Sequence, residues 1–157
     1  MSGFFSRTKS LAGAQRANLN TGGVYFEEGT YLVQVDSVAM KEVRNGEAFI
    51  VETTVLESTN PARPAGMSVS WFVGFKVPEA SERDIYLFFA ACFGHANDAE
   101  WIRNNLTPEA LDLLTSKSNP VGVQKLRMPL VVQSRPNKTN SGMFSVHKWG
   151  NAQNPLT

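Results

Sequence analysis

Residues 67–76 read MSVSWFVGFK, and this stretch decides the fold. Every second residue in it is apolar, while most of the positions between are small or polar. Successive side chains of a β-strand point to opposite faces, so an alternation sustained over the whole stretch predicts a strand with one buried face. Trp71 lies in phase with the apolar positions and is expected in the core. Phe72 and Lys76 lie on the opposite face, which has the composition of a solvated sheet surface.

Two more strands precede this one. Residues 31–40 alternate as far as Asp36, after which the apolar phase shifts by one position. Such a shift predicts a β-bulge, which bends a strand around a small barrel. Asn45-Gly46 is the strongest short signal for a tight hairpin, and residues 48–57 alternate again as the returning strand.

A helical segment follows the third strand. Ser81 is placed to cap a helix that runs to Cys92, and Gly94 is placed to end it. A second short helix is expected around Trp101. A third is predicted more clearly, with Thr107 at the N-cap and a proline at the first helical position.

Two final strands, residues 126–133 and 143–149, are joined by a turn rich in Asn, Ser and Gly. In the last strand, Phe144 and Val146 are the natural inward pair. The alternate positions, which would then face outward, are Ser145, His147 and Trp149.

Three strands, a helical segment and two strands follow one another in the order of an OB-fold. We therefore expect a mainly β fold, a five-stranded OB-like barrel with a helical insertion between strands 3 and 4. Residues 1–26 are expected to form a flexible basic N-terminal arm, residues 27–150 the OB-like domain, and residues 151–157 a short C-terminal tail. In an OB-fold the binding surface crosses the second and third strands, and the loops corresponding to residues 41–47 and 136–142 border it.

The totals are those of one globular domain. The chain has 157 residues, of which 42% are hydrophobic and 18% charged, enough for a real core. Cys92 is the only cysteine and lies in an apolar run, so a buried inert thiol is expected. No apolar run is long enough to cross a bilayer, and the N-terminus lacks a secretory pattern. We expect no membrane contact and a reducing cytoplasmic setting; residues 1–23 have the composition of a transit peptide, but an arm is the simpler interpretation.

Residue patterns for catalysis are missing from the sequence. His95 and His147 have no partners at metal-ligand spacing. Gly22-Gly23 fits neither of the common phosphate-binding loops. Cys92 has no evident basic neighbour that would activate it. We therefore expect no enzyme, no cofactor, no metal and no small-molecule substrate.

Acidic residues are confined to the middle of the chain. All 14 lie between Glu27 and Asp112, whereas basic residues alone occur before Glu27 and after Asp112. Beyond roughly 10 Å charges are largely screened at physiological salt, so a polyanion would meet the basic ends separately from the acidic middle. The last basic stretch also contains His147 and Trp149 beside Lys148. Positive charge mixed with flat rings is typical of proteins that bind single-stranded nucleic acid.

Two aromatic residues have open roles. Phe72 could stack on a base or pack under the arm or a helix, and Trp149 could stack on a base or close one end of the barrel. Trp71 is better explained as a core residue than as a stacking platform. Glu52 and Glu57, in the second strand, are expected to point away from a groove that holds a polyanion.

The chain resembles the single-stranded DNA-binding proteins of bacteriophages over residues 26–150. The resemblance is carried by Glu28-Gly29-Thr30-Tyr31, by Asn45-Gly46, by the helical segment before Leu130-Val131-Val132, and by the stretch from Lys138 to Phe144. It implies an OB-fold that coats single-stranded DNA during replication and recombination, in the cytoplasm of the host cell. Cellular and some phage relatives end in an acidic tail that recruits partner proteins. Residues 151–157 contain no acidic residue, so recruitment through such a tail is not expected.

The sequence thus predicts a non-sequence-specific single-stranded DNA-binding protein that protects the strand, with self-association along the strand as one role open to the basic arm. The alternative is a β-barrel adaptor for protein interactions, in a virion or a replisome, that binds no nucleic acid. An uncharacterised small enzyme is the third and weakest alternative. The residues expected to contact DNA are Lys41, Arg44, Phe72, Lys76, Arg127, Arg135, Lys138, His147, Lys148 and Trp149.

Overall fold

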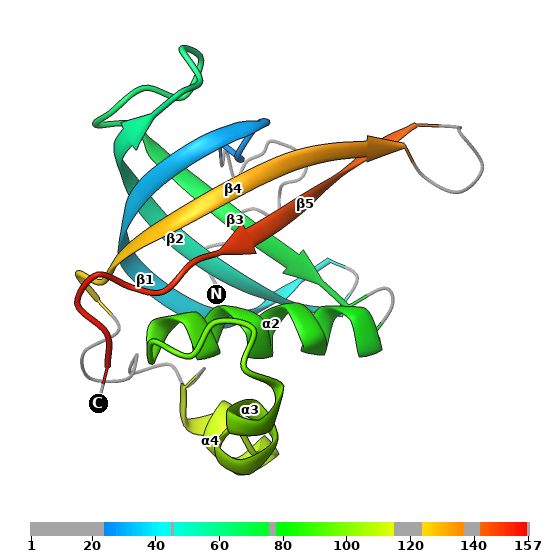
Figure 1. Cartoon of the computed structure of the whole chain (residues 1–157). Helices are drawn as coiled ribbons and strands as arrows, with labels where there is room; N and C mark the ends of the chain where they lie inside the picture. The colour runs from blue at the N-terminus through cyan, green and yellow to red at the C-terminus, as the bar shows by residue number, and fades with distance from the viewer. Residues whose placement is uncertain (1–23, 45, 76–77, 115–123, 137–141, 157) are drawn as a thin grey trace.

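The computed structural model describes residues 24–44, 46–75, 78–114, 124–136 and 142–156. The expected order of three strands, a helical segment and two strands is confirmed (Figure 1). The strands are β1 (Gly29–Val43), β2 (Gly46–Ser58), β3 (Ser68–Gly74), β4 (Arg127–Pro136) and β5 (Met143–Trp149). The helices are α2 (Pro78–Cys92), α3 (Ala99–Asn105) and α4 (Pro108–Leu114).

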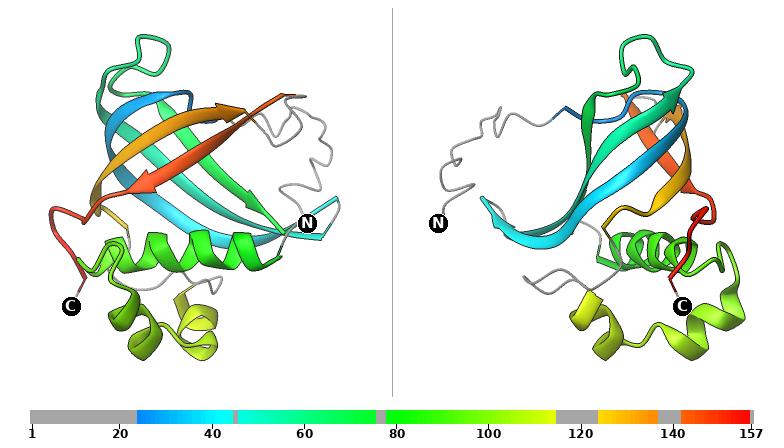
Figure 2. Two further views of the ribbon diagram at one scale, coloured as in Figure 1. Left: turned by 45° about the vertical axis from the view of Figure 1, so that its right-hand side comes forward. Right: turned by 90° about the vertical axis from the view of Figure 1, so that its left-hand side faces the viewer.

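All five strands form one antiparallel sheet in the order β3-β2-β1-β4-β5. The sheet is strongly coiled, and α2 lies across one of its ends, with α3 and α4 on the far side of α2 (Figures 1 and 2). In the described part of the chain, no hydrogen-bonded ladder joins the edge strands β3 and β5. The fold is therefore mainly β, as predicted, whereas the expected closure into a barrel is not formed by strand pairing there.

The bend in β1 comes from an irregularity in its pairing. The register of β1 against β2 skips Asp36, the extra residue of a bulge, and shifts once more after Leu32. The buried side chains change phase at the same place, from Val35 to Val38. The predicted bulge is thereby confirmed. β1 pairs with β2 from Tyr31 to Val43, whereas only its residues from Gly29 to Gln34 pair with β4.

The inner face of the sheet and one face of α2 form the core. Ile85, Phe88 and Phe89 of α2 are at most 2% exposed. The ring centroid of Phe88 lies 5.9 Å from that of Phe49 and 5.6 Å from that of Trp71. Burying a side chain of this size stabilises a fold by roughly 1.5–3 kcal/mol. The position predicted for Trp71, in the core, is confirmed.

The helical segment differs from expectation only at its start. α2 begins at Pro78, so Ser81 lies inside the helix and is not its N-cap. The Ser81 hydroxyl donates to the carbonyl of Gly74 at 2.5 Å and links the helix to the end of β3. The N-cap predicted at Thr107 is confirmed, because its hydroxyl accepts from the backbone N–H of Ala110 at 3.1 Å.

Side chains span the gap between β3 and β5, for which the described part of the chain gives no backbone ladder. The ring centroid of Trp71 on β3 lies 5.3 Å from that of Trp149 and 5.8 Å from that of His147, both on β5. Phe88 of α2 also packs on Trp149, with ring centroids 4.9 Å apart. We call this cluster of Trp71, Phe88, His147 and Trp149 the seam, because it brings the two edge strands of the sheet together.

Residues 24–26 add a short strand-like segment to the free edge of β3. Tyr25 forms an isolated parallel bridge with Ser70, and the Ser70 N–H donates to the carbonyl of Val24 at 2.7 Å. Phe26 is buried and packs on His147 of the seam and on Tyr31, with ring centroids 6.0 and 5.1 Å away. These residues, assigned to the arm from the sequence, pack on the sheet; residues 1–23 lie outside the described part of the chain.

Candidate nucleic-acid interface

The outer surface of β2 and β3 is the first candidate interface. Its outward side chains are Ile50, Glu52, Thr54, Ser68, Ser70 and Phe72, with Tyr25 beside them. We call this set the β3 face. Phe72 pairs with Ile50 across the strands and remains 42% exposed. Of the roles left open for Phe72, packing under a helix does not fit this exposure, whereas packing under residues 1–23 concerns residues outside the described part of the chain.

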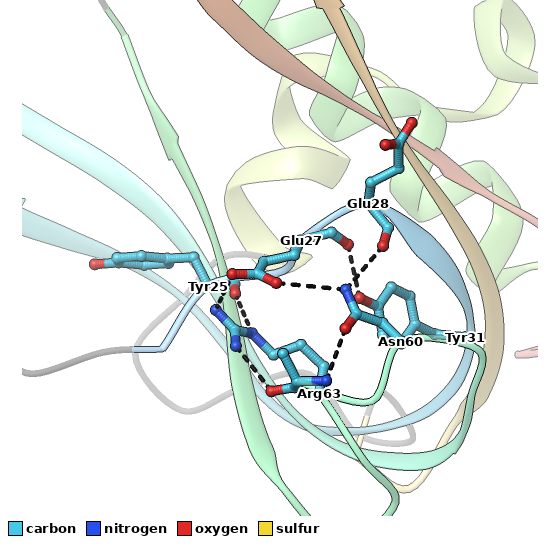
Figure 3. A network of polar contacts seen from close by, with 7 residues as sticks. Tyr25, Glu27, Glu28, Tyr31, Asn60 and Arg63 are labelled. Carbon is cyan, nitrogen blue, oxygen red and sulfur yellow. Dashed lines mark hydrogen bonds and ion pairs between the residues drawn. The ribbon is translucent and has the colours of Figure 1, made fainter.

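Tyr25 is a component of this face that the sequence did not reveal. Its side chain is 49% exposed, and its ring stands edge-on to that of Phe72, with centroids 6.4 Å apart and planes inclined by 73°. A side-chain network holds the backbone at this point: the Arg63 Nε–H donates to the Tyr25 carbonyl at 2.7 Å. In Figure 3 the Tyr25 ring points away from this network.

The network in Figure 3 ties the loop between β2 and β3 to the segment before β1. Arg63 Nη2 lies 3.4 Å from Glu27 Oε2, and the Asn60 amide donates to the Glu28 carbonyl at 2.9 Å. The Tyr31 hydroxyl donates to the Glu27 carbonyl at 2.6 Å. Hydrogen bonds to a charged group are worth more than neutral ones. The network therefore fixes where Tyr25 enters the β3 face.

Glu52 contradicts the expectation drawn from charge. It pairs with Ser70, shares the β3 face with Phe72, and its Oε1 accepts from the Ser70 hydroxyl at 2.5 Å. Glu57 is exposed near the far end of β2, paired with Leu32. The prediction that Glu52 points away from the groove is wrong, because the alternation of β2 places it in phase with Ile50. Phe72, Tyr25 and the Glu52 carboxylate thus share the described part of the β3 face.

Basic residues of the first hairpin lie toward one end of the β3 face. Lys41 is partly buried and pairs with Ala48, two positions before Ile50 on β2. Arg44 is exposed where β1 ends. Lys76, also expected to contact DNA, lies outside the described residues, as does Lys138 of the second hairpin.

The outer surface of β4 and β5 is the second candidate interface. Its outward side chains are Val131, Gln133, Arg135, Phe144, Val146 and Lys148, and we call this set the β5 face. Arg135 pairs with Phe144, which is 49% exposed, and Val131 pairs with Lys148. The Arg135 guanidinium donates to Gln133 Oε1 at 2.7 Å. β4 and β5 contain no acidic residue. Glu28, which precedes β1, brings a carboxylate to β4, where its Oε2 accepts from the Ser134 N–H at 3.4 Å.

Arg127 lies apart from Arg135, the other basic residue of β4. It is the first residue of β4, it pairs with Gln34, and its side chain is exposed. Its backbone N–H donates to Asn154 Oδ1 at 2.9 Å. Arg135 lies at the opposite end of the same strand, so the structure does not bring the two arginines together.

The two sides of β5 are exchanged relative to the sequence-based expectation. Trp149 is 7% exposed and pairs with Leu130, whereas Phe144 faces solvent. His147 pairs with the buried Val132 and packs in the seam. Both residues were expected on the outside, and that orientation is wrong, because Trp149 is buried and His147 is partly buried in the seam; their contact with DNA stays a prediction. Of the two roles left open for Trp149, closing one end of the sheet fits its packing.

Burial also decides the charge of His147. Burial lowers the pKa of His147 to about 4, because a charged imidazole would lose its hydration among the rings. At neutral pH His147 is therefore uncharged and carries no positive charge to the β5 face. The indole N–H of Trp149 is buried and has no hydrogen-bond partner in the described part of the chain.

Other reactive groups do not assemble into a catalytic site in the described ranges. Burial raises the pKa of the Cys92 thiol, whose Sγ lies 3.7 Å from Met128 Sδ in the core. His95 stacks on Trp101 with planes at 4°, and its Nδ1 lies 3.4 Å from Asp98 Oδ2. The backbone N–H of Trp101, and then His95, lower the pKa of Asp98, which caps α3.

Metal and membrane sites were sought in the same ranges. None of the described residues form a group of three or more His, Cys, Asp or Glu that could hold a metal ion. The helices of the described chain are too short or too polar to span a membrane.

The chain matches no protein-family model, and no curated protein matches it at a significant level. The function is therefore inferred from the geometry of the two faces.

Proposed function

We propose that this protein binds single-stranded DNA through an OB-type fold and protects the strand during replication and recombination. The observation that carries the proposal is the pair of exposed rings, Tyr25 and Phe72, on the outer surface of β3. An OB-fold binds its ligand on that surface. Bases stack on exposed aromatic rings irrespective of sequence, because every base has a π-face.

The topology supports an OB-type fold. The sheet order and the helix between β3 and β4 are those of the OB-fold, in which β3 and β5 approach each other. Here the approach is made by Trp71 and the rings of β5. The first strand is bent by a bulge, as a small barrel requires.

In this proposal the two faces contact different parts of the DNA strand. The β3 face receives bases on Phe72 and Tyr25, and the β5 face receives phosphates on Arg135 and Lys148. Basic side chains gain affinity by releasing counterions from phosphates, so their contribution depends on salt. Stacking on a ring does not release counterions. The division therefore makes different predictions for the two faces.

The test measures anisotropy of a labelled, mixed-sequence single strand and of the matching duplex. The wild-type protein is expected to bind the single strand more tightly, with affinity falling as salt rises. Phe72→Ala should weaken binding by roughly five- to 150-fold, the value of one stacked base, whereas Phe72→Tyr should retain it. Phe144→Ala removes an equally large and similarly exposed ring from the β5 face. Because the proposal places no base on that ring, this variant should weaken binding less than Phe72→Ala does.

An adaptor for protein interactions is the second candidate, and one observation favours it. The β3 face combines exposed rings, the buried Ile50 and the carboxylate of Glu52, and aromatic residues are enriched in protein interfaces. No binding to the single strand even at low salt would remove the DNA proposal and leave the adaptor.

A further inference from the structure

Glu52 places a negative charge on the β3 face, and a surface that binds only phosphates would not need one. Two neighbours flank Ser70 on this face. Glu52 is its partner on β2, and Tyr25 is its partner in the short parallel bridge on the other side. Phe72 is the next outward residue of β3. Diagonal neighbours on one side of an antiparallel pair lie roughly 7–8 Å apart, within reach of long side chains. A base stacked on Phe72 would therefore have the Glu52 carboxylate at its edge.

The hydrogen bond from Ser70 positions that carboxylate and uses only part of its acceptor capacity. Glu52 Oε1 accepts from the Ser70 hydroxyl at 2.5 Å, and Glu52 is partly buried. An ionised carboxylate has about four lone-pair sites, so further donors can be accommodated. Ser70 is itself 7% exposed, and Tyr25 lies on its other side. The carboxylate is thus held beside Ser70.

We propose that Glu52 determines which bases the β3 face accepts, favouring bases with an exocyclic amino group and disfavouring thymine. This inference rests on the proposed function. Cytosine donates from its N4 amino group and a carboxylate accepts that bond, whereas thymine presents the O4 acceptor at the same position. Two acceptors cannot hydrogen-bond each other, so thymine would bring its O4 against the carboxylate without gaining the bond that cytosine makes.

Cytosine and thymine make the sharpest comparison because they have the same ring size and so similar stacking area. Oligo-dC and oligo-dT of equal length carry the same number of phosphates, so electrostatic attraction to the β5 face cancels in their ratio. We expect wild-type protein at pH 8 to bind oligo-dC roughly fivefold to tenfold more tightly than oligo-dT, about the lower range for one base contact.

Glu52→Gln tests the residue with almost no change of shape. The variant is expected to bring the ratio of the two affinities close to one. Glu57→Gln is the matched control, since it removes one carboxylate from an exposed position at the far end of the same strand. It should raise the affinity for both oligonucleotides equally and leave their ratio unchanged. Ser70→Ala should lower the ratio partially, because Ser70 acts as a positioning residue for the carboxylate.

The outcomes separate the two proposals. Equal wild-type affinities for oligo-dC and oligo-dT, or a ratio that Glu52→Gln leaves unchanged, would overturn the role of Glu52 while the DNA-binding function stands. Failure to bind either oligonucleotide would overturn the function and with it this inference. Thermal unfolding of each variant verifies that the β3 face is intact when the ratio is measured.

Discussion

The β3 face and the β5 face each present an exposed aromatic ring, but different charges surround the two rings. Phe72 lies near Glu52, whereas Phe144 pairs with Arg135 on strands that contain no acidic residue. A surface that only attracts phosphates has no use for a carboxylate. Under the proposed function, base contact and phosphate contact would fall on separate parts of one sheet, which the seam joins on its inner side.

The largest effect is expected from breaking the seam. Trp149→Ala removes a 7% exposed indole that packs on Trp71 and Phe88. Truncating a buried Phe or Trp costs about 3–5 kcal/mol of unfolding free energy. Urea denaturation followed by circular dichroism measures the loss. Phe144→Ala, on the opposite side of the same strand, should change stability by less than about 0.5 kcal/mol; equal losses for both variants would mean that the assigned sides of β5 are wrong.

The second prediction concerns the pH dependence of the seam. The pKa of His147 is lowered to about 4 in the folded chain and lies near 6.5 when unfolded. Between these values the unfolded chain binds more protons, so stability falls as pH drops from about 6.5 to 4, by up to about 3 kcal/mol. Urea denaturation at several pH values measures this slope.

His147→Phe supplies the control for that slope, because it keeps a ring in the seam and cannot titrate there. Carboxylates elsewhere titrate in both proteins, so the difference between the two curves belongs to His147. Parallel curves for wild type and variant over pH 4 to 6.5 would contradict the burial of a neutral imidazole.

The strands and helices could be predicted because they depend on local periodicity. The alternation of residues 67–76 needed no tertiary information, nor did the phase shift at Asp36 or the cap at Thr107. Which side of β5 faces the core could not be predicted in this way. Both of its faces contain apolar or aromatic side chains, so a period of two residues identifies the strand but not its inner side. Contacts with Trp71 and Phe88, distant in sequence, decide that Trp149 faces inward.

The candidate site was less predictable than the fold. Tyr25 is held by one bridge and by Arg63, which lies 38 positions away, and neither contact leaves a repeating pattern. The side on which Glu52 lies follows from the alternation of β2. Its position beside Phe72 could have been predicted once β2 and β3 were paired. The overall segregation of charge in the sequence concealed it, because net charge over a segment does not specify the face on which each side chain lies.

The smallest expected effect distinguishes the faces most directly. For single strands, the slope of log affinity against log salt falls by about 0.7 for each phosphate contact that is lost. Lys148→Ala and Arg135→Ala should each reduce the slope by about that amount and weaken binding severalfold at low salt, since both side chains are exposed on the β5 face. Phe72→Ala should weaken binding at every salt concentration and leave the slope unchanged.

Anisotropy titrations at four or more salt concentrations measure these slopes. Arg103→Ala is the matched control, because Arg103 is an exposed basic residue on α3, on the far side of α2 from the sheet. Its loss should leave the slope within error of wild type if phosphates contact only the β5 face. A slope reduced equally by Arg103→Ala and Lys148→Ala would show that the strand senses net charge alone, and the separation of base and phosphate contacts between the two faces would then fail.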